Sequence, residues 1–329
     1  MRKLCYTLPM PKIVITCGGT GGHIYPALAI AEHLPKEEVV FLGTTDRLES
    51  ELIPREGYAF RTISSSRKNP LVILKGVFQA LSYILKTRPA LVISTGGYVT
   101  IPVIIASGLL GVSIFMQEQN LLPGKVNRFL SHFAEKIFYA FPETKQYFKK
   151  KGVLTGNPTR RKIAELFAQT KDFSRSPKKI LILGGSQGAK AIDEVIPLVD
   201  FTSVNSELMH LNQQNYEHDI QELYREAHLV VCRAGASTLA ELAICGLPAI
   251  LIPYPYAAGN HQYFNAKAFA DQEAAVVLEQ KRLSPSMLIS IIKTLLETPG
   301  RLEKMSLAMR KMARPQAAEE IAKAIKEKL

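Results

Sequence analysis

The chain has 329 residues, of which 47% are hydrophobic and 21% charged, which is enough to build two domains with buried cores. Its formal net charge is +12, but no recognition helix, aromatic platform or metal knuckle accompanies the basic residues, which speaks against nucleic acid as a partner. The four cysteines share no metal-ligand spacing, so we expect free thiols in a reducing compartment, no metal site and no cofactor.

The first half of the chain alternates short apolar runs with helical patterns. Residues 99–116 are uncharged, but Pro102, Gly108 and Gly111 interrupt them, so we expect a helix, a turn and a strand there rather than a membrane span. Alternating strands and helices predict a parallel sheet with helices on both faces. Strands are expected near residues 12–17, 39–42, 90–94, 113–116 and 136–139, and helices near 25–34, 48–56, 71–85, 99–110 and 124–133.

The second half begins after residues 156–158 and a polar linker at 170–179, and it repeats the alternation. From Ser284 onward the tail reads as helical, because Ser284 is a suitable N-cap and Pro285 a suitable first helical residue. Strands are expected near residues 180–183, 229–232, 249–252 and 275–278, and helices near 189–196, 219–227, 237–245 and 262–271.

Two glycine-rich turns stand between a strand and a helix about half a chain apart, at residues 18–23 and 184–189. Glycine lets the backbone turn sharply and lets a phosphate approach the amides. The helix that follows directs free N–H groups and its positive end toward such an anion. The pair of turns therefore predicts two nucleotide-binding α/β domains that face each other across a cleft.

Two side chains are candidates for a general base. His23 follows the first glycine-rich turn and has an ordinary pKa near neutrality, so it could take a proton from an acceptor hydroxyl; holding an acceptor phosphate or a structural role are the alternatives. Glu118 is the only acid between Gly57 and Glu135, and it lies at the end of a predicted strand, where α/β active sites gather.

The segment at residues 67–78 is basic and apolar at once. Its predicted helix has a wider apolar surface than one core stripe requires, and the acid-free stretch at 57–117 surrounds it. Such a helix suits the surface of an anionic membrane, although a buried helix of the first domain is the alternative. The residues expected at the membrane are Arg67, Lys68, Leu71, Leu74, Lys75 and Phe78.

Seven motifs, in order along almost the whole chain, resemble the MurG family of bacterial glycosyltransferases. They are residues 18–23 with Pro26, residues 96–99 with Pro102, residues 118–120 with Pro123, Gly124, Asn127 and Arg128, residues 156–158 with Arg160, residues 184–189, residues 232–236 with Thr238 and Glu241, and residues 261–262 with Asn265 and Ala266.

The resemblance implies the α/β GT-B fold, in which two Rossmann-like domains face each other across a cleft. It implies inverting transfer of N-acetylglucosamine from UDP-N-acetylglucosamine to lipid I, which forms lipid II for peptidoglycan at the cytoplasmic face of the bacterial cell membrane, with peripheral attachment. We expect residues 1–158 to bind the acceptor and the membrane, residues 159–310 to bind the donor, and a helix at 311–329 to pack back on the first domain.

The resemblance also implies roles for single residues. Glu241 would bind the uridine ribose, and His261 and Gln262 would contact sugar hydroxyls; a helix-stabilising role for Glu241 and a capping role for His261 are the alternatives. Glycine amides at a helix N-terminus would stabilise the pyrophosphate leaving group without a metal. The other expected donor-binding residues are Thr20, Gly21, Gly22, Asn120, Arg160, Ser186, Gln187, Ala236, Ser237 and Thr238.

Three features depart from the family pattern. Gln117 stands where the family usually has a histidine, the segment between Gly188 and Cys232 is short, and residues 216–220 replace an apolar contact to uracil. Another glycolipid glycosyltransferase of the same fold and a non-catalytic nucleotide-sugar sensor therefore remain open. Radiolabelled transfer from UDP-N-acetylglucosamine to a lipid I analogue would settle most of these alternatives.

Overall fold

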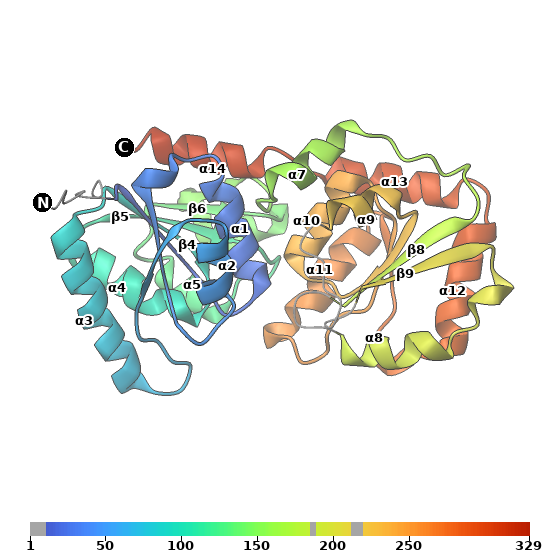
Figure 1. The fold of residues 1–329 in the computed structure, drawn as a ribbon, viewed down its shortest axis with the longest axis horizontal. Helices are drawn as coiled ribbons and strands as arrows, with labels where there is room; N and C mark the ends of the chain where they lie inside the picture. Colours follow the sequence, from blue (N-terminus) through green and yellow to red (C-terminus); the bar gives the residue numbers. More distant parts are fainter. Residues whose placement is uncertain (1–10, 185–188, 212–219) are drawn as a thin grey trace, which may run out of the picture.

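The computed structural model describes residues 11–184, 189–211 and 220–329, and these form two α/β domains side by side (Figure 1). The N-terminal domain contains a parallel seven-stranded sheet in the order β3-β2-β1-β4-β5-β6-β7. Its strands are β1 (Ile13–Cys17), β2 (Val39–Gly43), β3 (Ala59–Thr62), β4 (Leu91–Gly96), β5 (Ser113–Glu118), β6 (Lys136–Tyr139) and β7 (Gly152–Leu154).

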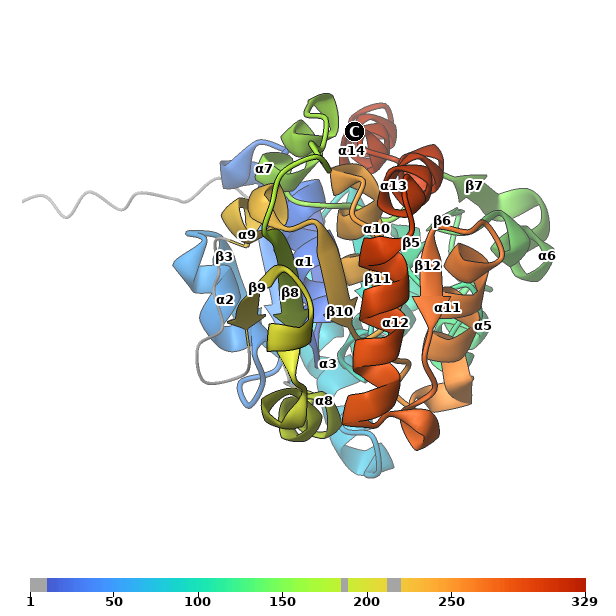
Figure 2. The same cartoon turned by 90° about the vertical axis from the view of Figure 1, so that its right-hand side faces the viewer.

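The C-terminal domain contains a parallel five-stranded sheet in the order β12-β11-β10-β8-β9, seen in front in Figure 2. Its central strands are completely buried because helices cover both faces, which explains their continuous apolar sequences. The strands are β8 (Lys178–Leu183), β9 (Ser206–Leu211), β10 (Leu229–Cys232), β11 (Ala249–Leu251) and β12 (Ala275–Val277).

The helices of both domains lie between successive strands, with three helices at the end of the chain. In the N-terminal domain they are α1 (Gly21–Ala31), α2 (Glu49–Arg55), α3 (Pro70–Thr87), α4 (Ile101–Leu109), α5 (Lys125–Leu130) and α6 (Lys145–Phe148). The later helices are α7 (Arg161–Ala164), α8 (Lys190–Val195), α9 (Gln221–Glu226), α10 (Ala236–Cys245), α11 (His261–Ala270), α12 (Pro285–Glu297), α13 (Arg301–Met312) and α14 (Ala317–Lys326).

Most of the predicted elements are confirmed, and the differences have local causes. Strands β3, β7 and β9 were not predicted, because each is short or carries mostly exposed or half-buried side chains. Helix α1 begins at Gly21, earlier than the predicted residue 25, because its two glycines belong to the helix. Residues 99–116 form a helix, a turn and a strand as predicted, and no helix in the described ranges is long and apolar enough to cross a bilayer.

The chain passes between the domains twice. After β7 it enters α7 of the C-terminal domain, and after α13 it returns, so that Ile321 and Ile325 of α14 pack with β1 and α1 in the core of the N-terminal domain (Figure 1). The two passages touch at Gly156, which has a φ of +96° and where an added Cβ would lie 2.3 Å from Cβ of Arg314. Glycine is therefore required there on both conformational and steric grounds.

Candidate active site between the two domains

His23 lies in the first turn of α1, beside the carboxyl ends of β1 and β4. Its Nδ1 is 2.9 Å from the carbonyl oxygen of Thr95, which can only accept, so Nδ1 carries the proton and Nε2 keeps its lone pair. Burial lowers the pKa of His23, and electrostatic interactions with His261 and Arg67 lower it further, against the hydrogen bonds to Thr95 and Gln119. This side chain is thus held as a neutral imidazole with a basic nitrogen.

A row of buried amide side chains supports this histidine. Gln119 donates from Nε2 to the same Thr95 carbonyl and to Oε1 of Gln117, each over 2.5 Å. Gln117 in turn donates to Oδ1 of Asn157 over 3.2 Å. Gln117, which replaces the histidine usual in the family, is therefore part of a hydrogen-bonded row that does not titrate.

Glu118, the other candidate base, is 1% exposed at the end of β5. Its Oε1 accepts hydrogen bonds from N and Nδ2 of Asn120 over 2.9 and 3.2 Å, and its Oε2 accepts one from Nδ2 of Asn127 over 2.7 Å. Burial raises the pKa of Glu118, and these hydrogen bonds oppose that shift. Both oxygens of Glu118 thus accept hydrogen bonds from neighbouring asparagines, so this carboxylate holds the loop after β5 against α5.

Hydrogen bonds join the domains both at this loop and at the start of α1. Asn265 of α11, which is completely buried, donates from Nδ2 to Oδ1 of Asn120 over 3.1 Å and accepts from N of Leu121 over 3.0 Å. Ser237, in the first turn of α10, donates from Oγ to the carbonyl oxygen of Gly22 over 3.2 Å. The N-terminal turns of α1 and α10 therefore meet across the domain interface, with Thr20, Gly21, Ala236 and Thr238 beside them.

Arg160 and Glu241 are brought together from different parts of the chain. The Nη2 of Arg160 is 3.9 Å from Oε1 of Glu241, and its guanidinium lies 4.7 Å from the centre of the Tyr25 ring. Tyr224 donates to Oε2 of Glu241 over 2.8 Å. Burial raises the pKa of Glu241, and the charge of Arg160 and the hydrogen bond from Tyr224 oppose that shift.

His261 and Gln262 begin α11, close to the same interface. The Nδ1 of His261 donates to the carbonyl oxygen of Ala258 over 2.8 Å, and Oε1 of Gln262 accepts from the Tyr254 amide over 2.9 Å. Both side chains brace the loop that precedes their helix and remain partly exposed. The predicted residues Ser186 and Gln187, and residues 216–219 of the predicted uracil contact, lie outside the described residues.

Other interacting residues were not predicted from the sequence. Tyr98 joins two arginines, because Arg47 donates to its hydroxyl over 3.3 Å and the guanidinium of Arg67 lies 5.1 Å from its ring centre. Arg67, which we expected at the membrane, thus lies close enough to His23 to affect its pKa. Tyr224 gave no signal of its own, because its importance comes from a partner far away in the sequence. Asn265 stands in one of the motifs, but the sequence assigned it no role.

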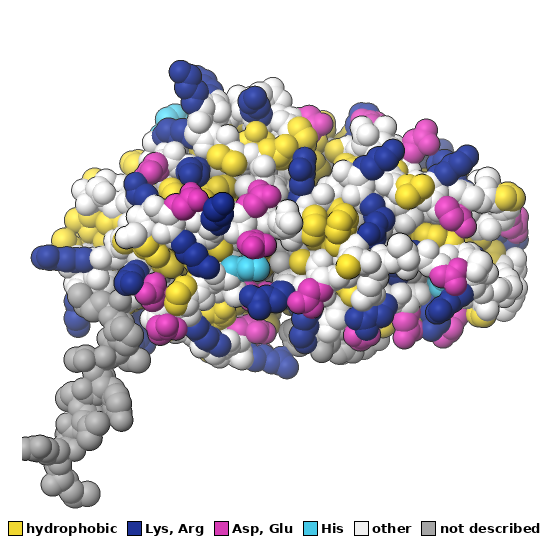
Figure 3. All heavy atoms as spheres, turned by 90° about the horizontal axis from the view of Figure 1, so that it is seen from above, with side chains coloured by type: hydrophobic (Ala, Val, Ile, Leu, Met, Phe, Trp, Pro, Cys, Tyr) yellow, Lys and Arg dark blue, Asp and Glu magenta, His cyan; other side chains and the backbone are white. Residues whose placement is uncertain are grey.

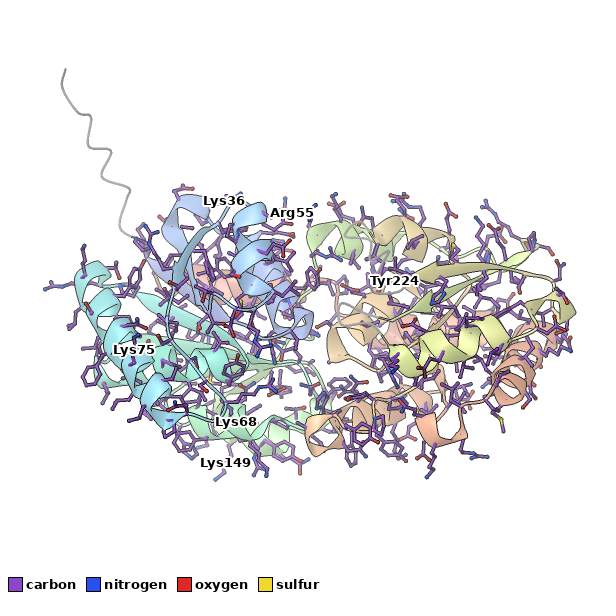
Figure 4. All side chains as sticks on the ribbon, turned by 60° about the horizontal axis from the view of Figure 1, so that its bottom comes forward. Lys36, Arg55, Lys68, Lys75, Lys149 and Tyr224 are labelled. Carbon is purple, nitrogen blue, oxygen red and sulfur yellow. The ribbon has the colours of Figure 1, made fainter. Side chains whose placement is uncertain are left out.

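Helix α3 has two apolar faces. Val77, Ala80 and Ile84 are buried in the domain core, whereas Leu71, Leu74 and Phe78 are 73%, 51% and 64% exposed. Lys75 lies on α3 at the outer side of the N-terminal domain, and Lys68 lies further inward, just before the helix begins (Figure 4). By contrast, acidic and basic side chains are intermingled over both domains on the face that Figure 3 shows.

The described residues contain no group of three or more histidine, cysteine or acidic side chains that could hold a metal. Two parallel-sheet domains that meet at the carboxyl ends of their strands define the class of GT-B glycosyltransferases. Residues 13–139 match the glycosyltransferase family 28 N-terminal domain, and residues 198–321 match the glycosyltransferase family 28 C-terminal domain. Within this class the chain belongs to the MurG family.

Similarity to MurG proteins extends over nearly the full length. The UDP-N-acetylglucosamine--N-acetylmuramyl-(pentapeptide) pyrophosphoryl-undecaprenol N-acetylglucosamine transferase of Halothermothrix orenii is 37% identical, over 93% of this chain and 96% of that protein. The Desulfitobacterium hafniense protein of the same name is 35% identical, over 95% and 98%. The crystal structure of Acinetobacter baumannii MurG superposes with a TM-score of 0.80 at 30% identity, covering 96% of this chain and all of that one.

Proposed function

We propose that this protein transfers N-acetylglucosamine from UDP-N-acetylglucosamine to lipid I, the undecaprenyl-pyrophosphoryl N-acetylmuramyl pentapeptide, and so forms lipid II. The observation that carries the proposal is the contact between Ser237 and Gly22, which opposes the first turns of α10 and α1 with His23 in the latter. A donor bound to one domain and an acceptor bound to the other would then meet beside a basic nitrogen. Full-length similarity to MurG proteins supports this choice of substrates.

His23 is the proposed general base. Its Nε2 takes the proton from the acceptor hydroxyl while that oxygen forms a bond to the anomeric carbon of the donor. The bond from this carbon to the UDP oxygen breaks at the same time, and UDP leaves with the electron pair. Attack from the side opposite the leaving group inverts the anomeric centre. The hydrogen bond to Thr95 supports this role because it leaves Nε2 unprotonated.

The donor is proposed to lie on the C-terminal domain. Negative charge builds on the leaving diphosphate, and the free amides at the N-terminus of α10, with Ser186 and Gln187 of the second glycine-rich turn, are suited to stabilise it. Glu241 would accept hydrogen bonds from the ribose hydroxyls, and Arg160 would keep this carboxylate ionised. His261 and Gln262 would contact the sugar hydroxyls from the start of α11.

The acceptor and the membrane are assigned to the N-terminal domain. Leu71, Leu74 and Phe78 project from α3 with Lys68 and Lys75 beside them, a combination that favours the interface of an anionic bilayer. We propose peripheral attachment at the cytoplasmic face of the cell membrane through this helix. Arg67, just before α3, lies over the Tyr98 ring and close enough to His23 to affect its pKa, where it could attract the pyrophosphate of a lipid-linked acceptor.

A transfer assay tests the function directly. The purified protein is given radiolabelled UDP-N-acetylglucosamine and a short-chain lipid I analogue, and the label is expected in the lipid product with release of UDP. A matched analogue without the N-acetylmuramyl sugar should receive no label. Label on a different glycolipid would favour another glycosyltransferase, and binding of UDP-N-acetylglucosamine without any transfer would favour a sensor.

A further inference from the structure

Glu49, the first residue of α2, is a completely buried carboxylate that the proposed reaction does not use. Its Oε2 accepts a hydrogen bond from the backbone N of Gly19 over 3.1 Å. Its Oε1 accepts from Oγ1 of Thr44 over 2.8 Å and, more weakly, from N of Thr44 over 3.4 Å. The carboxylate therefore links the loop after β2 to the first glycine-rich turn.

The turn is shaped around this carboxylate. A Cβ added to Gly18 would lie 2.6 Å from Oε1 of Glu49 and 2.9 Å from Cγ2 of Val99, so only glycine fits there. Gly19 has a φ of +91°, in the region that side-chain-bearing residues rarely adopt. A Cβ on Gly97 would in turn lie 2.4 Å from the carbonyl oxygen of Gly18. The two glycine-rich loops of this domain are thus packed against each other.

The same contacts lead to His23. Helix α1 begins two residues after Gly19, and the imidazole of His23 packs so closely on the second loop that a Cβ on Gly96 would lie 3.1 Å from its Nδ1. A shift of the turn at Gly19 would therefore displace both the start of α1 and the Gly96–Gly97 loop. Displacements of about 1 Å are enough to reduce a rate about 100-fold.

We propose that Glu49 is a positioning residue that holds the first glycine-rich turn in the shape that places His23 against the acceptor. This inference rests on the proposed function. What matters is the reach of the carboxylate oxygen to the Gly19 amide, and the negative charge itself is secondary. Glutamine keeps that reach, because its oxygen can accept from Gly19 while its NH₂ group donates to the Thr44 hydroxyl, and only the weak bond from the Thr44 amide is lost. Aspartate keeps the charge but is one methylene too short.

The test compares Glu49→Gln, Glu49→Asp and Thr44→Val as full-length proteins. We expect Glu49→Asp to lower kcat for the lipid I analogue about 10- to 100-fold, while Glu49→Gln and Thr44→Val stay within about 3-fold of the parent. The affinity for UDP, measured by calorimetry, should remain unchanged in all three. If Glu49→Gln is the weaker enzyme and Glu49→Asp is near normal, the charge matters and the positioning role is wrong.

A second readout does not depend on the acceptor. Amide hydrogen exchange of the peptide that contains residues 18–23 should be faster in Glu49→Asp than in the parent, and unchanged in Glu49→Gln. Equal protection in all variants would overturn the inference even if every protein is active. Conversely, a parent protein that transfers no sugar would overturn the proposed function, while this exchange pattern would still decide whether Glu49 holds the turn.

Discussion

Asn265 of the C-terminal domain and Asn120 of the N-terminal domain share a hydrogen bond of 3.1 Å between Nδ2 and Oδ1. Asn120 also donates to Glu118, so the buried acid of one domain is connected to α11 of the other through a single side chain. A displacement of the loop after β5 would therefore displace the helix that begins with His261 and Gln262. This connection links the N-terminal domain to the C-terminal domain through side chains alone.

The coupling between the two asparagines can be measured by a double-mutant cycle. We expect Asn120→Ala and Asn265→Ala each to lower kcat/KM, and the double variant to lower it by less than the product of the two effects. The coupling energy should be about 0.5–3 kcal/mol, as for residues in one hydrogen-bonded network. Effects that multiply independently would show that the bridge does not act as a unit during turnover.

Glu241 should contribute to the affinity of the protein for UDP. Glu241→Ala is expected to weaken UDP binding by about 1–3 kcal/mol in calorimetry, because a charge-assisted hydrogen bond to ribose is lost. Tyr224→Phe is the matched control, since it removes the hydroxyl that donates to Glu241 and leaves the carboxylate in place. Unchanged UDP affinity in Glu241→Ala would exclude the ribose contact.

Replacing the proposed base should affect chemistry and spare binding. His23→Ala is expected to reduce kcat by about 10²–10⁴, the usual contribution of a general base. UDP-N-acetylglucosamine should still bind with near-parent affinity, since Glu241 lies in α10 on the other side of the interface. If Glu118→Gln proves to be the crippled variant and His23→Ala is mild, the base is Glu118.

The pH dependence of the reaction should reflect the surroundings of His23. Burial lowers the pKa of His23, so the neutral, basic form persists below the ordinary value of about 6.5 and activity falls only at lower pH. Arg67→Ala removes a positive charge that contributes to this shift, so the acidic limb of kcat/KM should move to higher pH. An acidic limb that is identical in both proteins would show that Arg67 does not influence the pKa of the catalytic base.

The free energy of unfolding should also depend on pH through His23, and the direction of this dependence follows from the shift of its pKa. Because the folded state lowers the pKa of His23, the unfolded chain binds the proton more readily. The contribution of His23 to stability is therefore complete above the unfolded value of about 6.5 and is lost as the pH falls below it. Denaturant unfolding of the parent and of His23→Gln between pH 7.5 and about pH 5 measures this difference.

Membrane attachment should require the exposed face of α3. In co-sedimentation with anionic vesicles, Leu74→Ser/Phe78→Ser and Lys68→Glu/Lys75→Glu are both expected to reduce binding. Salt should weaken the basic contribution, because charges are screened over about 10 Å at 0.1 M, and should leave the apolar part intact. Leu198→Ser/Leu307→Ser, which alters exposed leucines of the other domain, is the control. Parent-like sedimentation of both α3 variants would place the contact elsewhere.

The sequence predicted the fold where one local property decides the structure. Completely buried strands such as β1, β4 and β10 read as continuous apolar runs, and the glycine-rich turn at 18–23 marks the start of α1. Strand β3 was missed because neighbouring strands, and not its own exposed side chains, determine that it pairs.

The candidate site was predictable only in part for the same reason. Motifs identify His23, Arg160 and Glu241, but nothing near Tyr224 in the sequence indicates that its hydroxyl meets Glu241. Glu49 stands in a segment rich in acidic and basic residues, which is typical of a solvated helix, and yet it is completely buried. Which polar side chains are buried together depends on the packing of distant segments, which local patterns do not contain.

The contact between Gly156 and Arg314 has a mechanical consequence. The two segments that connect the domains lie next to each other at this point, at one edge of the interface (Figure 1). Together they form a single hinge made of two adjacent chain segments. Two adjacent segments restrain the twisting of one domain against the other more than a single segment would. The first turns of α1 and α10 would then meet in the same relative position each time the domains close.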